Sequence, residues 1–249
     1  MNEHESSSVP WGIWATIGLS LVIVACFLLV QVLGAGLFTM IVQNNNPDLD
    51  FEEFSISLQT NGFLIASVTC ATTATTVGLI ALFASLRKRA TLRGYLHLYP
   101  VSVKTLCTWI GVALVFAIAW DGLTYLLGRA IIPEFMLRAY VTAYFVPLLW
   151  LAIVIAAPLA EELFFRGFLF EGIRYTRLGA TGAVVITSLL WALIHLQYGP
   201  YEISTVFILG LIFGVARLLT GSIYTSIAMH AFVNLVATVE VAVYIHYFR

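Results

Sequence analysis

The stretch Phe145–Gly167, FVPLLWLAIVIAAPLAEELFFRG, places Glu161, Glu162 and Arg166 at the end of a long apolar run that carries no other charge. An ionisable residue at membrane depth costs about 2.5 to 3.5 kcal/mol on insertion scales, so two adjacent glutamates need a reason. In a helix, Glu162 and Arg166 are at positions i and i+4 with the acid first, which favours an ion pair. Glu161 lies about 100° further round the helix and is expected to be free for chemistry. The alternative is a purely structural ion-pair cluster near the membrane interface.

The composition is that of an integral membrane protein. Of the 249 residues, 61% are hydrophobic and only 10% are charged, whereas a soluble domain carries about 25% charged residues. The formal net charge of −1 argues against a nucleic-acid partner. The three cysteines, Cys26, Cys70 and Cys107, lie within apolar runs without paired spacing. They predict neither a disulfide framework nor a zinc knuckle.

Apolar runs of membrane-spanning length predict an all-α polytopic membrane protein with about seven transmembrane helices, eight being the alternative count. A span needs about 20 predominantly apolar residues. The first run lacks the basic start of a cleaved signal peptide, so it counts as a span. The expected spans are 11–42, 62–86, 105–127, 145 into the glutamate stretch, 179–196, 203–219 and 222–244. Residues 1–144 would form an N-terminal region of three spans, and residues 145–249 would form a catalytic transmembrane core.

The distribution of basic residues predicts the orientation in the membrane. The loop after the second span holds the strongest basic cluster of the chain, with Arg87, Lys88, Arg89, Arg93 and Lys104. The positive-inside rule places this loop in the cytoplasm. The short polar tail of residues 1–10 would then also be cytoplasmic, and the acidic loop of residues 43–60 would lie outside. Further basic residues expected on the cytoplasmic side are Arg174, Arg177 and Arg217.

Two later spans carry polar side chains within apolar surroundings. His195 follows Trp191 by about one helical turn, near the end of its run. His230 and Asn234 are four residues apart and therefore project from the same helix face. A lone histidine on an apolar helix is usually a satisfied core residue. Three helices that each present such a group indicate a site instead.

Hairpin geometry predicts that these groups meet. The turn between the fourth and fifth spans centres near Leu178, and Glu161 and His195 lie equally far before and after it. Residues equidistant from the turn of an antiparallel hairpin face each other, here about 25 Å from the turn at 1.5 Å per residue. His230 and Asn234 lie about 13 to 20 Å from the last turn, which is a compatible depth. We therefore expect a polar cluster inside the membrane, toward the cytoplasmic leaflet.

Such a cluster fits peptide hydrolysis by an activated water. A carboxylate near an imidazole deprotonates the water and returns the proton to the leaving amine. A second imidazole and an amide donate hydrogen bonds to the oxyanion. The same groups are alternatively ligands for a divalent metal, such as zinc, that acidifies the water. The competing interpretation is a proton- or ion-coupled transporter, since Glu and His chains also serve as relays. The chain lacks the duplicated halves expected of many transporters.

Three motifs in order resemble those of the CAAX prenyl protease and bacteriocin-processing membrane protease family. They are Glu161-Glu162-x-x-x-Arg166, Trp191-x-x-x-His195 and His230-x-x-x-Asn234. The resemblance covers roughly residues 146–239, the four-helix catalytic core of the family, and does not extend to the first three spans. Trp191 stands where the family commonly has Phe.

The resemblance implies a membrane endopeptidase in which Glu161 is the water-activating base and His195 its partner. His230 and Asn234 would be oxyanion donors or metal ligands. Glu162, Arg166 and Trp191 would support them. The implied metal set, if there is one, is Glu161, His195, His230 and Asn234.

The resemblance also implies the setting of the reaction. We expect a multi-pass protein of a bacterial inner membrane, with its site open toward the cytoplasmic leaflet. Its partners would be the lipid bilayer and a peptide or membrane-associated protein substrate. A non-catalytic bacteriocin-immunity or scaffold protein with the same fold is the alternative. The intact set of four polar residues favours the enzyme.

Overall fold

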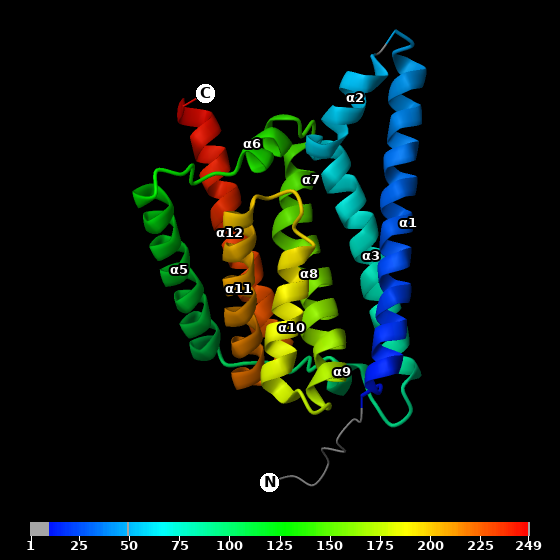
Figure 1. Ribbon diagram of the computed structural model, residues 1–249, viewed down its shortest axis with the longest axis vertical. Coiled ribbons are helices and arrows are strands. Elements are labelled where there is room, and N and C mark those ends of the chain that lie inside the picture. Colours follow the sequence, from blue (N-terminus) through cyan, green and yellow to red (C-terminus); the bar gives the residue numbers. More distant parts are fainter. Residues whose placement is uncertain (1–9, 49, 249) are drawn as a thin grey trace.

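The computed structural model describes residues 10–48 and 50–248, and these form helices joined by loops and turns, without a strand (Figure 1). Within these residues, six helices are long and apolar enough to cross a membrane. They are α1 (Ile13–Asn45), α3 (Gly62–Leu86), α5 (Val103–Leu126), the composite helix Val146–Arg174, α11 (Pro200–Thr220) and α12 (Ile223–Phe248). The predicted all-α polytopic membrane fold is confirmed. The polar tail predicted over residues 1–10 lies, apart from Pro10, outside the described residues.

The fifth predicted span is shorter than the others. It forms α10 (Gly179–Leu193), a helix of 15 residues. At 1.5 Å per residue it is about 22 Å long, less than the roughly 30 Å of a bilayer's hydrocarbon core. The following helix begins at Pro200, and Gly199 before it is extended at ψ 170°, as expected for the residue preceding a proline. Residues 194–199 therefore form a loop, and the last helical turn predicted for this span, up to residue 196, is absent.

The composite helix contains two π-helical segments on either side of the glutamate pair. It runs through α7 (Val146–Trp150), η2 (Leu151–Ala156), α8 (Ala157–Glu162), η3 (Leu163–Leu169) and α9 (Phe170–Arg174), with η2 and η3 in π-helical form. Pro158, which has no N–H to donate, follows the first π-helical segment. Such wide turns occur frequently at functional sites, and here they change which side chains face the neighbouring helices.

The composite helix, α10, α11 and α12 pack together as a four-helix group. On one side α3 packs along the composite helix, and α1 packs on α3 (Figure 1). On the other side α5 packs against α12 and α11. The N-terminal helices therefore flank the core on two sides. The boundary predicted between residues 144 and 145 stays a prediction.

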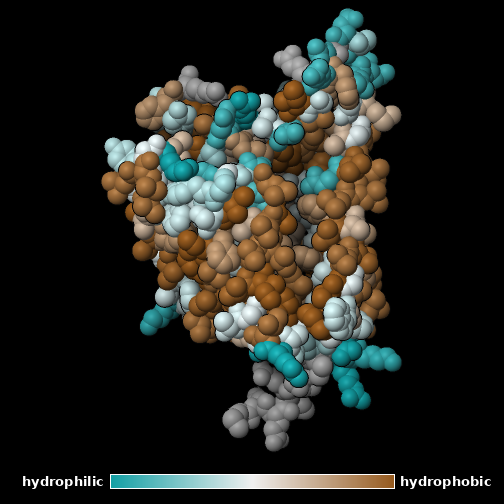
Figure 2. All heavy atoms as spheres, in the orientation of Figure 1, coloured by the Kyte–Doolittle hydropathy of each residue, from teal (hydrophilic) through white to brown (hydrophobic). Residues whose placement is uncertain are grey.

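The two ends of the bundle differ in charge. At one end α3, α9 and α11 finish and α5 begins (Figure 1). We call this the basic end, since its residues include Arg87, Lys88, Arg89, Arg93, Lys104, Arg174, Arg177 and Arg217. The opposite end, which we call the far end, carries α2 (Phe51–Ser57) and α6 (Glu134–Val141). Between the two ends, apolar side chains cover most of the visible surface (Figure 2).

Candidate active site

The Glu162–Arg166 pair predicted from the i, i+4 spacing is present and fully buried. Arg166 Nη1 lies 3.0 Å from Glu162 Oε1, and both side chains are 0% exposed. His230 joins the pair from α12, with its Nδ1 3.0 Å from the same carboxylate oxygen. Because a carboxylate only accepts hydrogen bonds, His230 Nδ1 carries the proton and donates it. The pair is thus a triad that ties α12 to the composite helix.

A close approach of α10 and α11 completes the burial of Arg166. Arg166 Nη2 donates to the carbonyl oxygen of Gly210 at 3.2 Å. A Cβ atom at Gly210 would lie 2.9 Å from Ser188 Cβ and 3.1 Å from Arg166 Nη2. The glycine therefore lets the two helices approach and leaves room for the guanidinium group beside its carbonyl.

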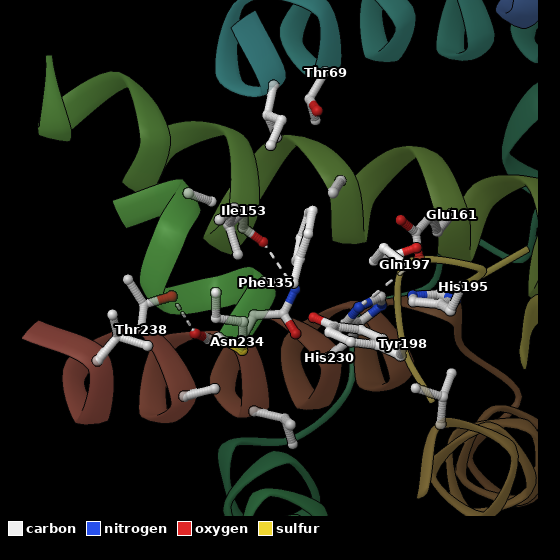
Figure 3. Close-up of a pocket in the computed structure, with 18 of the residues that line it drawn as sticks. Thr69, Phe135, Ile153, Glu161, His195, Gln197, Tyr198, His230, Asn234 and Thr238 are labelled. Carbon is white, nitrogen blue, oxygen red and sulfur yellow. Dashed lines mark hydrogen bonds and ion pairs between the residues drawn. The ribbon is translucent and has the colours of Figure 1, made fainter. Parts of the chain in front are cut away.

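Glu161 has a different environment from its neighbour. Its side chain is 25% exposed and lies on a cavity (Figure 3). Trp191 Nε1 donates a hydrogen bond to Glu161 Oε2, and His230 Nε2 lies 4.0 Å from that oxygen. The guanidinium of Arg166 lies against the Trp191 ring, 4.5 Å from its centroid. Arg166 therefore supports both glutamates, Glu162 directly and Glu161 through the indole.

His195 lies beside the cluster, just beyond the end of α10. Its Nδ1 is 2.7 Å from the backbone oxygen of Trp191, and a carbonyl there requires a proton on Nδ1. Its ring stacks on Tyr198 at 6.1 Å between centroids. The predicted direct pairing with Glu161 is absent, because no ion pair within 4.0 Å joins these two among the described residues. The last turn of α10 presents Trp191 to Glu161 instead, since the helix ends at Leu193.

Asn234 occupies the cavity wall one turn beyond His230. Its Nδ2 donates to the carbonyl oxygen of Ile153 at 2.9 Å, within the π-helical segment before the glutamates. Thr238 donates to the Asn234 backbone oxygen. The amide therefore fixes the distance between α12 and the composite helix while it faces the cavity (Figure 3).

One cavity brings all four predicted catalytic residues together. It has a volume of about 260 Å³, and its lining includes Glu161, His195, His230 and Asn234. Three lining residues that sequence reasoning missed are Phe135 on α6 and Gln197 and Tyr198 on the loop after α10. Burial raises the pKa of Tyr198 to about 12, so its phenol stays a proton donor. Short loops carry no periodic pattern. The one signal in the sequence for Gln197 and Tyr198 is that they follow His195 closely along the chain.

The cavity extends toward the far end of the bundle, away from the basic end. The predicted opening toward the cytoplasmic leaflet stays a prediction, because it depends on the orientation in the membrane. The lining of the cavity reaches Ile65 near the start of α3 and Ala139 on α6. Hairpin geometry predicted how far Glu161 lies from the turn. It said nothing about which side of Glu161 is filled by other side chains, and that depends on packing between distant segments.

The four predicted metal ligands, Glu161, His195, His230 and Asn234, all line one cavity. Among the residues that the structure describes, no group of three His, Cys, Asp or Glu side chains is placed to hold a metal ion. The hydrogen bonds of three candidate ligands leave their ligating atoms free. Asn234 uses its amide nitrogen, and His195 and His230 use Nδ1, bonded to a carbonyl and a carboxylate respectively, as histidines that bind metal through Nε2 commonly do. Zinc dependence stays a prediction that a chelator tests.

The fold and this site together define a polytopic membrane protein with a buried polar cluster on an internal cavity. Residues 142–236 match the model of a family described as type II CAAX prenyl endopeptidase Rce1-like. This match confirms the resemblance found in the motifs, which lie within the matched segment. The chain has no match among the curated proteins or among the solved structures with which it was compared.

Proposed function

We propose that this protein is an intramembrane endopeptidase that hydrolyses a peptide bond with a water activated by Glu161. One observation carries the proposal. Of two adjacent glutamates, one is 0% exposed in an ion pair with Arg166, and the other is 25% exposed on a cavity. A structural ion-pair cluster would leave the second carboxylate without a purpose that offsets its cost at membrane depth.

The reaction that this arrangement supports begins with a water bound to Glu161. The hydrogen bond from Trp191 holds Oε2, which leaves Oε1 to accept a proton from the water. The water oxygen attacks the peptide carbonyl carbon and forms a tetrahedral intermediate. Glu161 then returns the proton to the amide nitrogen, the C–N bond breaks, and a carboxylic acid and an amine result.

The imidazoles are the candidates to stabilise the oxyanion of this intermediate. His230 has its Nδ1 proton committed to Glu162, and its Nε2 faces the cavity near Glu161. A proton on Nε2 would make the ring an imidazolium that donates to the oxyanion, and the Glu162 carboxylate would stabilise that charge. His195 also lines the cavity. Because its Nδ1 proton is bound to a backbone oxygen, its Nε2 would likewise donate to the oxyanion only as an imidazolium.

A peptide-cleavage assay tests the proposal. The full-length protein, purified in detergent, is incubated with a library of fluorogenic peptides, with and without a chelator, and beside the Glu161→Gln variant. We expect cleavage that needs Glu161. Cleavage lost with the chelator would assign a metal, and no cleavage of any peptide would favour the immunity or scaffold function. The library includes prenylated and unprenylated peptides, since the family description names a prenyl endopeptidase.

The proposed setting is a bacterial inner membrane with the N-terminus in the cytoplasm. This orientation rests on the basic end, and the positive-inside rule assigns that end to the cytoplasm. Reporter fusions after Arg93 and after Tyr175 test it. Cytoplasmic signals are expected at both positions, and an external signal at either would reverse the orientation.

A further inference from the structure

We infer that the catalytic cavity is open to the extracytoplasmic side of the membrane, so that the substrate is a peptide segment of an exported or membrane-anchored protein presented from that side. This inference rests on the proposed endopeptidase function. It concerns how the substrate reaches Glu161, and four features of the structure support it: the charge of the two ends, the packing below the site, the lining above it, and the length of α10.

The charge asymmetry orients the molecule. The basic end carries eight of the described basic side chains, those of Arg87, Lys88, Arg89, Arg93, Lys104, Arg174, Arg177 and Arg217. The segments of the far end carry Arg129 and Arg138 together with Asp48, Asp50, Glu52, Glu134 and Glu202. Such an excess of Lys and Arg marks the cytoplasmic side, so the far end lies outside the cytoplasm.

The protein is densely packed between Glu161 and the basic end. The turns of the composite helix that follow Glu161 are buried almost without interruption from Glu162 to Ile173. Arg166, Phe168 and Phe170 are each 0% exposed. A peptide arriving from the cytoplasm would therefore have to displace the buried Glu162–Arg166 pair or the aromatic layer beneath it.

The other direction holds connected space. The catalytic cavity shares Phe135, Gln197 and Tyr198 with a second cavity of about 330 Å³. That second cavity is also lined by Arg129, Glu134 and Glu202, all from segments of the far end. The deep part of the site is mainly apolar and its mouth is polar. This suits an extended peptide that places an apolar side chain inward and its backbone near the water-filled mouth.

The short α10 explains how the opening forms. The helix ends at Leu193, and the loop of residues 194–199 lies below the far ends of α7 and α12 (Figure 1). Irregular backbone at membrane depth is tolerated only where it is buried in protein or lines a water-filled cavity. Gln197 and Tyr198 of this loop line both cavities, so the loop forms the wall of an aqueous vestibule on the far side.

Thiol accessibility in intact cells tests the direction of opening. Single cysteines are placed in a version of the chain with Cys26, Cys70 and Cys107 replaced by serine. Gln197→Cys reports the mouth, Ala237→Cys the cavity wall, and Lys88→Cys the basic end. Cells are treated with a small charged thiosulfonate that does not cross the membrane, and cysteines that remain unmodified are then counted with a fluorescent maleimide in detergent.

We expect complete modification of Gln197→Cys and Ala237→Cys in intact cells. Permeabilising the membrane should give no further modification of these two cysteines. Lys88→Cys should be modified only after permeabilisation. Modification of Lys88→Cys in intact cells, or of the cavity cysteine only after permeabilisation, would overturn the inference. Ala157→Cys, on the opposite cavity wall, replaces Ala237→Cys if that variant does not accumulate.

The same thiol-modification measurements are repeated in variants that also carry Glu161→Gln, so that the accessibility of the cavity is measured without catalysis. External modification without any peptide cleavage would refute the endopeptidase and leave the direction of opening established. Peptide cleavage by the purified protein, together with modification of the cavity cysteines only from the cytoplasm, would support the endopeptidase and refute the extracytoplasmic opening. The two ideas therefore fail separately.

Discussion

The described part of the chain contains two buried carboxylate–arginine clusters, and their comparison separates structure from chemistry. Near the middle of the bundle, Glu162 binds Arg166 and His230. At the basic end, Glu171, 3% exposed, binds Arg217 at 2.7 Å, His97 at 3.3 Å and Arg174 at 3.4 Å. Both clusters use one carboxylate oxygen to join several helices or loops through a histidine and at least one arginine.

What differs is the surroundings of the two clusters. The cluster of Glu162 adjoins a cavity on which a second carboxylate, Glu161, and the free edge of His230 are placed. The cluster of Glu171 adjoins none of the cavities described above and holds the loop of His97 against α9 and α11. A buried ion pair is therefore weak evidence of function by itself, and the chemistry is to be sought in the group beside it.

The largest effect should come from Glu161→Gln, which has no counterpart at the basic end. The change keeps size and polarity but removes the base, and general-base catalysis contributes about 10²- to 10⁴-fold. We expect the rate of cleavage to fall by at least about 10²-fold, while the melting temperature in detergent stays unchanged. The measurement is kcat/KM on the best peptide beside a thermal melt. Wild-type turnover in this variant would end the assignment of Glu161 as the base.

The next effect compares the two clusters directly. Glu162→Gln and Glu171→Gln each leave arginine without its buried partner, a loss that typically costs about 3 to 5 kcal/mol. We expect both variants to melt at lower temperature. Only Glu162→Gln should also lower the activity of the folded fraction, because it releases His230. If Glu171→Gln lowered kcat as much at a temperature where it is folded, the functional distinction between the clusters would fail.

The two clusters also show how far the sequence predicts the structure. Glu162 and Arg166 are four residues apart on one helix, so local geometry predicted their pair. Glu171 and Arg217 lie on different helices and meet only in the packed bundle, so no spacing rule pointed to them. His97 likewise meets Glu171 only in the packed bundle.

The fold was predictable for a similar reason, and the details of the site were not. Hydrophobic runs of span length depend only on local composition, and they identified all seven apolar helices. In the structure α10 ends early, at Leu193. The sequence placed His195 opposite Glu161, where the structure places Trp191. The side on which the cavity opens depends on contacts between distant segments.

A smaller effect is expected from Gly210→Ala, which tests the support of the Glu162 cluster from a distance. The new Cβ would lie 2.9 Å from Ser188 Cβ, and overpacking of this kind costs about 1 to 3 kcal/mol. We expect a lower melting temperature. Gly78→Ala is the matched control, since a Cβ there meets nothing within 4 Å. Equal melting temperatures for the two variants would show that α10 and α11 adjust freely.

The smallest effect should come from Trp191→Phe, which tests how Glu161 is held. Phe keeps an aromatic face for the Arg166 guanidinium, 4.5 Å from the present ring centroid, and loses the N–H that donates to Glu161 Oε2. A single hydrogen bond contributes about 0.5 to 1.5 kcal/mol net. We therefore expect kcat to fall by about two- to tenfold, with KM unchanged, since the indole orients the base and contacts no substrate in this proposal. Trp191→Leu, which also removes the face over Arg166, should in addition lower the melting temperature. A variant Trp191→Phe with full kcat would mean that His230, 4.0 Å from the same oxygen, suffices to orient Glu161.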